Sequence, residues 1–154
     1  MSATISGGSE PATFSLTNLS TSVLTIVSVD GSQQRAKVGT PFSTQLEAGV
    51  FNSGVRVGGA SVTFTAPSLN GASGTFANGR ATESDITDSN GHATSSTFTA
   101  NATLGNYSVS ATLSGNPTPA AFTLMNLAPV GVFAIGGTPQ RASVSGGLLD
   151  SWAM

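Results

Sequence analysis

Apolar and polar residues alternate along most of this chain. Over 42–50, Phe42, Leu46 and Val50 share one face with small residues, and over 106–114 Tyr107 and Val109 begin a second run of the same kind. A period of two puts one set into a core and the other into water. Gly and Pro interrupt the chain too often for long helices. The pattern predicts strands over 22–29, 34–38, 42–50, 60–66, 74–77, 83–87, 93–100, 106–114 and 119–126.

Turn residues separate these runs. Asn52-Ser53-Gly54, Asn70-Gly71, Asn78-Gly79, Asn90-Gly91 and Gly105-Asn106 all offer residues that accept a positive φ. Short strands with regularly spaced turns are typical of a β-sandwich. We therefore predict an all-β chain that forms an antiparallel β-sandwich.

Composition narrows the classes of function. The chain has 154 residues, which suits one domain, and 8% are charged against roughly 25% in an average protein. It holds 23 Ser and 20 Thr. The net charge is −2 and Lys and Arg do not cluster, so we expect no nucleic-acid partner. Cysteine is absent, which excludes disulfides and thiolate zinc sites. We expect no membrane span, since no apolar run reaches about 18 residues, and no signal peptide in residues 1–6.

The chain contains an internal repeat. Residues 11–19 (PATFSLTNL) recur as 119–127 (PAAFTLMNL) at an offset of 108, and 34–38 (QRAKV) recur as 140–144 (QRASV) at an offset of 106. Because the two offsets are nearly equal, we predict that the chain contains one complete repeat of a tandem array. We expect 1–20 to be the end of a preceding repeat, 21–127 a complete repeat, and 128–154 the start of the next repeat followed by a tail from 146 that does not match.

Several segments of the complete repeat are characteristic as a set: 55–67 (VRVGGASVTFTAP), 71–76 (GASGTF), 87–94 (TDSNGHAT), 98–101 (FTAN) and 105–111. Over about 20–127 the chain resembles bacterial immunoglobulin-like tandem repeats, similar in outline to the invasin and intimin type. The resemblance implies an immunoglobulin-like sandwich that acts as a spacer or adhesion module at the cell surface or outside the cell. It implies a host or cell-surface ligand, and no catalytic residue. Phe51 departs from the pattern, because related repeats usually carry a polar residue near this turn, and it is a candidate contact point. Tyr107 stands where such folds often carry a tyrosine corner.

One turn carries candidate metal ligands. Asp85, Asp88 and Asn90 precede Gly91 at spacings that could place hard oxygen ligands around Ca²⁺. The alternative, which we favour, is a hairpin whose Asp and Asn side chains stabilise the turn through bonds to the backbone. We therefore expect no resident cofactor, with Ca²⁺ as the one candidate.

The same turn suggests an alternative function. His92 could act as a general base oriented by Asp88 or Asp85, with a nearby serine as nucleophile: Ser95, Ser89 or Ser96. That arrangement would make a small hydrolase of ester or lactone bonds, with Ca²⁺-bound water as a second possible nucleophile. A chain this rich in serine places one near any histidine, so a solvent-facing strand residue is the favoured interpretation of His92.

The terminal repeats predict self-association. Residues 12–18 are strand-like, with Phe14 and Leu16 on one face. A lone apolar strand cannot satisfy its own backbone or bury its face. We expect it to add to an edge of its own sandwich or to a neighbouring chain, in a dimer or higher oligomer built by exchanged terminal strands.

Overall fold

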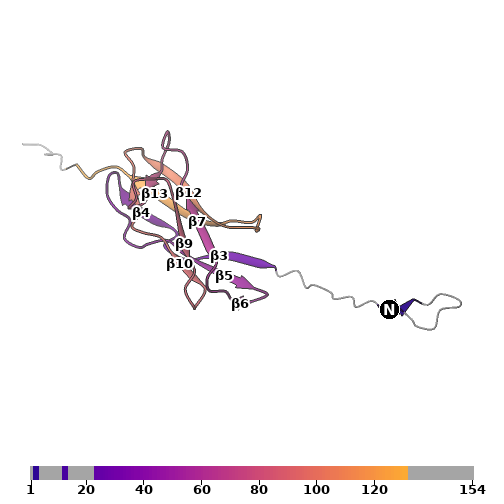
Figure 1. Ribbon diagram of the computed structural model, residues 1–154. Coiled ribbons are helices and arrows are strands. Elements are labelled where there is room, and N and C mark those ends of the chain that lie inside the picture. The colour runs from indigo at the N-terminus through magenta and orange to yellow at the C-terminus, as the bar shows by residue number, and fades with distance from the viewer. Residues whose placement is uncertain (1, 4–11, 14–22, 132–154) are drawn as a thin grey trace, which may run out of the picture.

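The computed structural model describes residues 2–3, 12–13 and 23–131 (Figure 1). Within these residues, all regular secondary structure is β-strand. A short antiparallel pair joins β1 (Ser2–Ala3) to β2 (Ala12–Thr13). The other strands are β3 (Leu24–Asp30), β4 (Gln34–Lys37), β5 (Glu47–Asn52), β6 (Val55–Arg56), β7 (Ser61–Thr65), β8 (Gly74–Thr75), β9 (Thr82–Ile86), β10 (His92–Thr94), β11 (Thr99–Ala100), β12 (Gly105–Leu113) and β13 (Ala120–Leu127). Within these ranges no helix is long and apolar enough to cross a membrane.

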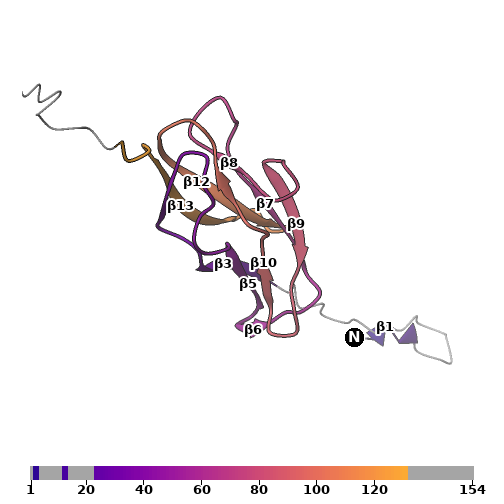
Figure 2. The ribbon, with the colours of Figure 1, turned by 90° about the vertical axis from the view of Figure 1, so that its left-hand side faces the viewer.

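Two sheets face each other, as Figure 2 shows. The first has the order β10-β5-β3, with β6 also paired to β5. The second has the order β4-β13-β12-β7-β9, and β8 pairs with β11 separately. The predicted all-β sandwich is confirmed.

One strand pair differs from a purely antiparallel sandwich. β4 runs parallel to β13, with Gln34 opposite Leu124 and Lys37 opposite Leu127. The cause is a change of sheet directly after β3. Gly31 has φ of +80°, and a Cβ atom there would overlap the backbone oxygen of Gln45. This position admits only glycine without rearrangement, and it lets the chain leave the first sheet and continue as β4 in the second.

The alternation seen in the sequence becomes the core. In β13, the residues at every second position are buried and their neighbours face outward. The core centres on aromatic rings from the second sheet and from connecting segments, with neighbouring centroids 4.7–6.4 Å apart: Phe64, Tyr107 and Phe122 lie in strands, and Phe42, Phe76 and Phe98 lie in connections. Offset and tilted ring pairs of this kind add to the stabilisation from burial.

Most predicted strands appear close to their expected bounds, with two differences. The stretch 42–50 becomes a strand only at Glu47, because the side chain of Gln34 bonds to both backbone groups of Thr44 and the Phe42 amide donates to Phe98 O. The stretch 93–100 divides into β10 and β11. The short strand β6 is an addition to the predicted set. The terminal segments, 1–20 and the residues after 131, fall largely outside the described residues.

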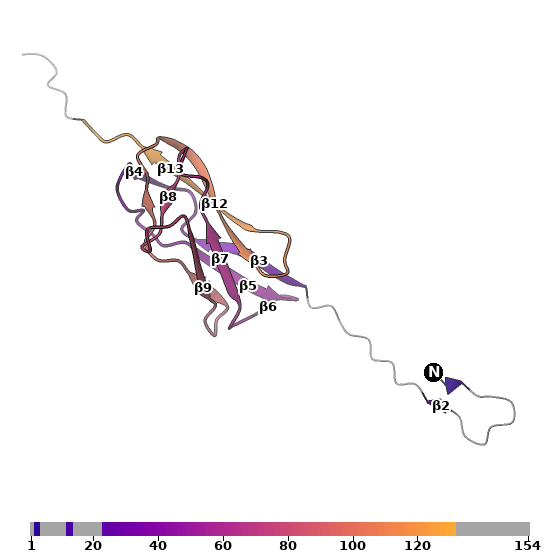
Figure 3. The same cartoon turned by 45° about the horizontal axis from the view of Figure 1, so that its top comes forward.

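The chain passes through the sandwich from one end to the other (Figure 3). At the N-terminal end, Leu24 lies opposite Asn52, and its carbonyl accepts a hydrogen bond of 2.9 Å from Asn116 in the β12–β13 loop. At the C-terminal end, Leu127 closes β13 near Gly105. These two places are called the N-terminal end and the C-terminal end of the sandwich below.

Candidate functional site

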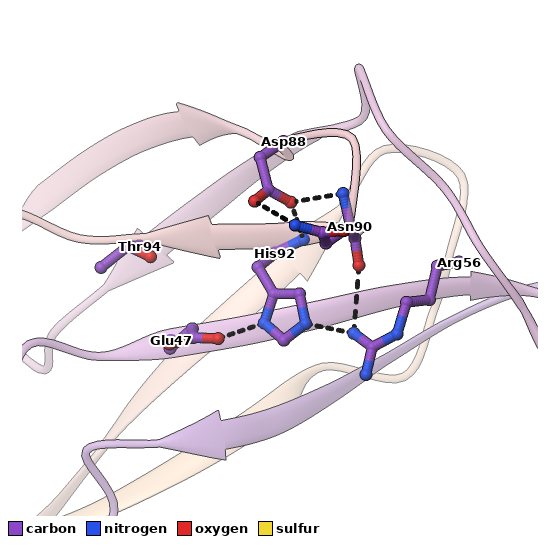
Figure 4. Close-up of a pocket in the computed structure, with 6 residues that line it drawn as sticks. All are labelled: Glu47, Arg56, Asp88, Asn90, His92 and Thr94. Atoms are coloured by element: carbon purple, nitrogen blue, oxygen red, sulfur yellow. Dashed lines mark hydrogen bonds and ion pairs between the residues drawn. The ribbon is translucent and has the colours of Figure 1, made fainter.

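A polar hollow of about 490 Å³ opens beside the turn that the sequence singled out (Figure 4). It draws on β5, β6, the 87–91 turn and β10. Its lining residues are Glu47, Arg56, Asp88, Asn90, His92 and Thr94.

Strand register places the central side chains. His92 lies opposite Gly49 on β5, and Arg56 lies opposite Phe51 on the same strand. Glu47, Gly49 and Phe51 share one face because they are two residues apart. Glu47 is therefore a diagonal neighbour of His92, within reach of a long side chain. A Cβ atom at Gly49 would lie 2.9 Å from Val29 Cγ2 and 3.2 Å from the Phe51 ring, so glycine here lets these two side chains pack closely.

The imidazole of His92 is bonded on both sides. Its Nδ1 contacts Glu47 Oε1, and its Nε2 contacts Nη1 of Arg56. A guanidinium can only donate, so Nε2 must accept and Nδ1 must carry the proton that it donates to Glu47. The geometry thus selects the neutral Nδ1-H tautomer. Its lone pair, which a general base would need, is directed at Arg56.

Arg56 is itself held by further contacts. Its Nη1 donates a hydrogen bond of 3.0 Å to the carbonyl of Asn90. Its guanidinium carbon lies 5.3 Å from the centroid of the Phe51 ring, which is the geometry of a cation–π contact. Phe51, the aromatic residue expected near a loop, is half-buried beneath it. The contacts join β5, β6 and the turn before β10.

Asp88 stabilises the turn. Its Oδ1 accepts hydrogen bonds from the amides of Asn90 at 2.8 Å and His92 at 2.9 Å. The backbone hydrogen bond from His92 is the main cause that holds the pKa of Asp88 below its ordinary value, and bonds from Asn90 act in the same direction. Asp88 does not bond to the imidazole ring. Glu47, which the sequence did not single out, takes that place.

The candidate metal ligands also bond to the backbone. Asp85 Oδ2 accepts a hydrogen bond of 2.9 Å from the amide of Thr94, and Asn90 Nδ2 lies 3.4 Å from Asp88 Oδ2. In the described part of the chain, no group of three or more Asp, Glu or His side chains is placed to hold a metal ion. The bonds of Asp88 and Asn90 are those of the turn that the sequence analysis favoured.

The candidate nucleophile lies elsewhere. Ser95 is buried, and its Oγ accepts a hydrogen bond of 3.1 Å from the amide of Leu46 and donates one of 2.9 Å to the carbonyl of Ser96. Ser96 Oγ donates to Glu83 Oε2 at 2.5 Å. Neither hydroxyl bonds to His92. The structure thus brings His92 together with Glu47 and Arg56, and not with Ser95.

Sequence reasoning missed Glu47 and Arg56 because they lie 45 and 36 residues from His92. The one available signal was the strand pattern, since Glu47 is the charged residue on the polar face of the predicted 42–50 strand. Its partner could be found only from the register between β5 and β10. No protein-family model matches the chain, and no curated protein matches it either.

Proposed function

We propose that this chain is a structural spacer and recognition module of a bacterial multi-repeat surface protein, built on an immunoglobulin-like sandwich. The supporting observation is that the chain enters one sandwich at its N-terminal end and leaves it at its C-terminal end. The body spans 24–127, close to the repeat offsets of 106 and 108 in the sequence. One sandwich per repeat, joined end to end, gives a linear array.

Strand order supports the immunoglobulin-like part of the proposal. β3, β5 and β10 correspond to strands A, B and E of such folds. β13, β12, β7 and β9 correspond to G, F, C and C′ of the variable type. The division of the first strand into β3 and β4 connects the two sheets at the edge where the parallel pair lies.

The composition and polar bonding of the body also fit a module outside the cell. Among the described residues, no buried side-chain nitrogen or oxygen lacks a hydrogen-bond partner. The sandwich therefore needs no ligand to complete its interior. Only 8% of the residues are charged, so the surface depends on Ser and Thr for its solubility.

The first test is mechanical. Pulling on the two ends of the sandwich loads β3 against β5 in shear and, through β3, loads β4 against β13, because the N-terminal side of β4 and the C-terminal side of β13 are drawn in opposite directions. All hydrogen bonds of the pair then bear the load together. The chain has no cysteine, so single attachment points can be introduced at exposed residues. We expect a Val23→Cys and Val130→Cys pair to resist force and then release about 300 Å of extended chain in one step.

A matched pair of attachment points provides the control. Leu104→Cys with Val130→Cys places both handles at the C-terminal end, where β12 and β13 separate one bond at a time. This geometry should open at a clearly lower force. Equal forces for the two geometries, or stepwise opening of the first, would contradict a load-bearing spacer.

The hydrolase alternative has less support from the site. Its base would need a free Nε2 on His92, and that atom contacts Arg56. We expect no turnover of a generic ester or lactone above buffer, with Ca²⁺ or with EDTA. Turnover by the wild-type chain that disappears in His92→Ala would favour the hydrolase over the spacer module.

A further inference from the structure

The two copies of the nine-residue repeat differ in a selective way. The second copy forms β13, in which Ala120, Phe122, Leu124 and Asn126 are buried. The first copy has the same residue at each corresponding position: Ala12, Phe14, Leu16 and Asn18. The positions that differ within the strand, Ala121, Thr123 and Met125, are exposed or half-buried. Residues 12–19 therefore carry the complete inward face of β13.

Asn126 makes this face specific. Its amide nitrogen lies 2.9 Å from each of three oxygens: Ser73 O, Asn101 Oδ1 and Thr103 O. Its own Oδ1 accepts a hydrogen bond of 3.0 Å from the Tyr107 hydroxyl. This contact replaces the side-chain to backbone bond of a tyrosine corner. A side chain that both donates and accepts is required, and Asn18 supplies it in the first copy.

Chain geometry prevents residues 12–19 from filling the β13 position of their own sandwich. Leu19 would then occupy the place of Leu127 at the C-terminal end, whereas β3 starts at Leu24 at the N-terminal end. The five steps from residue 19 to residue 24 reach at most about 18 Å. β3 and β4, which connect the two ends, together extend about 30 Å. The connection is too short, so the acceptor must be a different molecule.

We propose that residues 12–19 of one chain dock as a strand in the β13 position of a second copy, antiparallel to β12 and parallel to β4. Ala12 and Thr13 already have strand conformation in β2. The resident β13 is tethered to its site and has the same inward face, so it prevails while it is intact. Docking therefore takes place where the resident strand is weakened. The proposal concerns association between chains and does not depend on the spacer role.

The test weakens the resident strand in the full chain. Phe122→Ser removes the central ring of β13 and leaves Phe14 unchanged. We expect this variant to assemble into dimers or longer chains by light scattering, and to do so at lower concentration than the wild-type chain. The double variant Phe14→Ser with Phe122→Ser should lose the assembly. Assembly that persists in the double variant would overturn the proposal.

A peptide measurement covers the case in which Phe122→Ser does not fold. A synthetic peptide of residues 11–19 should restore the circular dichroism of the variant in a saturable way. A Ser15→Thr peptide, changed only at an outward position, should act equally well. An Asn18→Leu peptide should bind at least ten times more weakly, because it leaves the partners of Asn126 unsatisfied.

Two outcomes of the peptide measurement would refute the proposal. The first is an unfolded variant that none of these peptides restores. The second is equal action of the Asn18→Leu peptide and the unchanged peptide. Either failure leaves the force measurement on the wild-type sandwich unaffected.

Discussion

At the scale of single residues, the interior depends on a few side chains with several partners. Asn126 is 1% exposed and connects the β8 region, the 101–104 loop and Tyr107. Burial raises the pKa of the Tyr107 hydroxyl well above its ordinary value, so this group stays protonated and donates. Together they hold the loops at the C-terminal end.

Replacing Asn126 tests this bonding. Asn126→Leu keeps the approximate volume but removes one acceptor and the donors. We expect a loss of about 2–4 kcal/mol in the free energy of unfolding, because several buried polar groups lose their partner. Urea denaturation measures this loss. Thr123→Ala, an exposed change on the same strand, should stay within about 0.5 kcal/mol. Similar losses for both variants would contradict a stabilising role for the hydrogen bonds of Asn126.

The turn at Asp88 predicts a dependence on pH. The folded-state pKa of Asp88 is below its unfolded value, whose reference is 3.8. Its contribution to stability is therefore present above that value and is lost as the pH falls through the folded pKa. Asp88→Asn should lower the melting temperature at pH 6 and reduce the further loss between pH 4 and pH 2. Parallel melting profiles for the two proteins would show that the carboxylate contributes nothing.

The His92 contacts predict a tautomer. In the wild-type chain, nitrogen NMR of the imidazole should show a protonated Nδ1 and an unprotonated Nε2 at neutral pH, since Arg56 can only donate to Nε2. Arg56→Ala should permit the Nε2-H form. A dominant Nε2-H form in the wild-type chain would rule out the described arrangement.

At the scale of elements, the change of sheet between β3 and β4 determines the topology. Gly31 combines a φ of +80° with contact to the Gln45 backbone, whereas Gly39 has a φ of +74° and open space around it. Both positions carry backbone strain for other residues, and only Gly31 adds a steric conflict. A comparison of substitutions at the two glycines therefore separates the cost of backbone strain from the cost of steric conflict.

We expect Gly39→Ala to cost about 1 kcal/mol from backbone conformation alone. Gly31→Ala should cost more than about 2 kcal/mol, because the chain must also move away from Gln45. Chemical denaturation of the two variants provides the comparison. Equal costs would indicate that the close approach at Gly31 is relieved without loss.

At the scale of the whole molecule, the exposed apolar residues are distributed unevenly. Val23, Val55 and Ile86 lie at the N-terminal end, and Leu69, Leu104 and Val130 lie at the C-terminal end. Val27 and Val29 lie on the exposed edge strand β3. Among the described residues, six of the eight large exposed apolar side chains thus lie at the two ends of the sandwich.

The connected ring cluster predicts cooperative unfolding of the body. Phe42, Phe98, Phe76, Phe64 and Phe122 form a continuous series of ring contacts across the core. We expect one transition in urea, with the same midpoint by far-ultraviolet circular dichroism and by near-ultraviolet circular dichroism of the aromatic side chains. Separate midpoints would show that the body unfolds through a populated intermediate.

Local pattern alone determined much of the fold. The period of two in β12 and β13, and glycine at turns such as Gly79 and Gly91, act over a few residues, so they can be read directly from the chain. The same period of two predicted the strand at 119–126. The same local chemistry favoured a hydrogen-bonded turn at Asp88.

Tertiary structure decided the rest. The parallel pairing of β4 with β13 depends on the steric position of Gly31 against a residue from another strand. The partners of His92 come from β5 and β6, and only strand register brings Glu47 and Arg56 to it. The likeness of residues 12–18 to 120–126 is already present in the sequence, and the structure adds which positions of β13 face inward. Contacts between distant segments depend on how the sheets pack, and no local pattern contains that information.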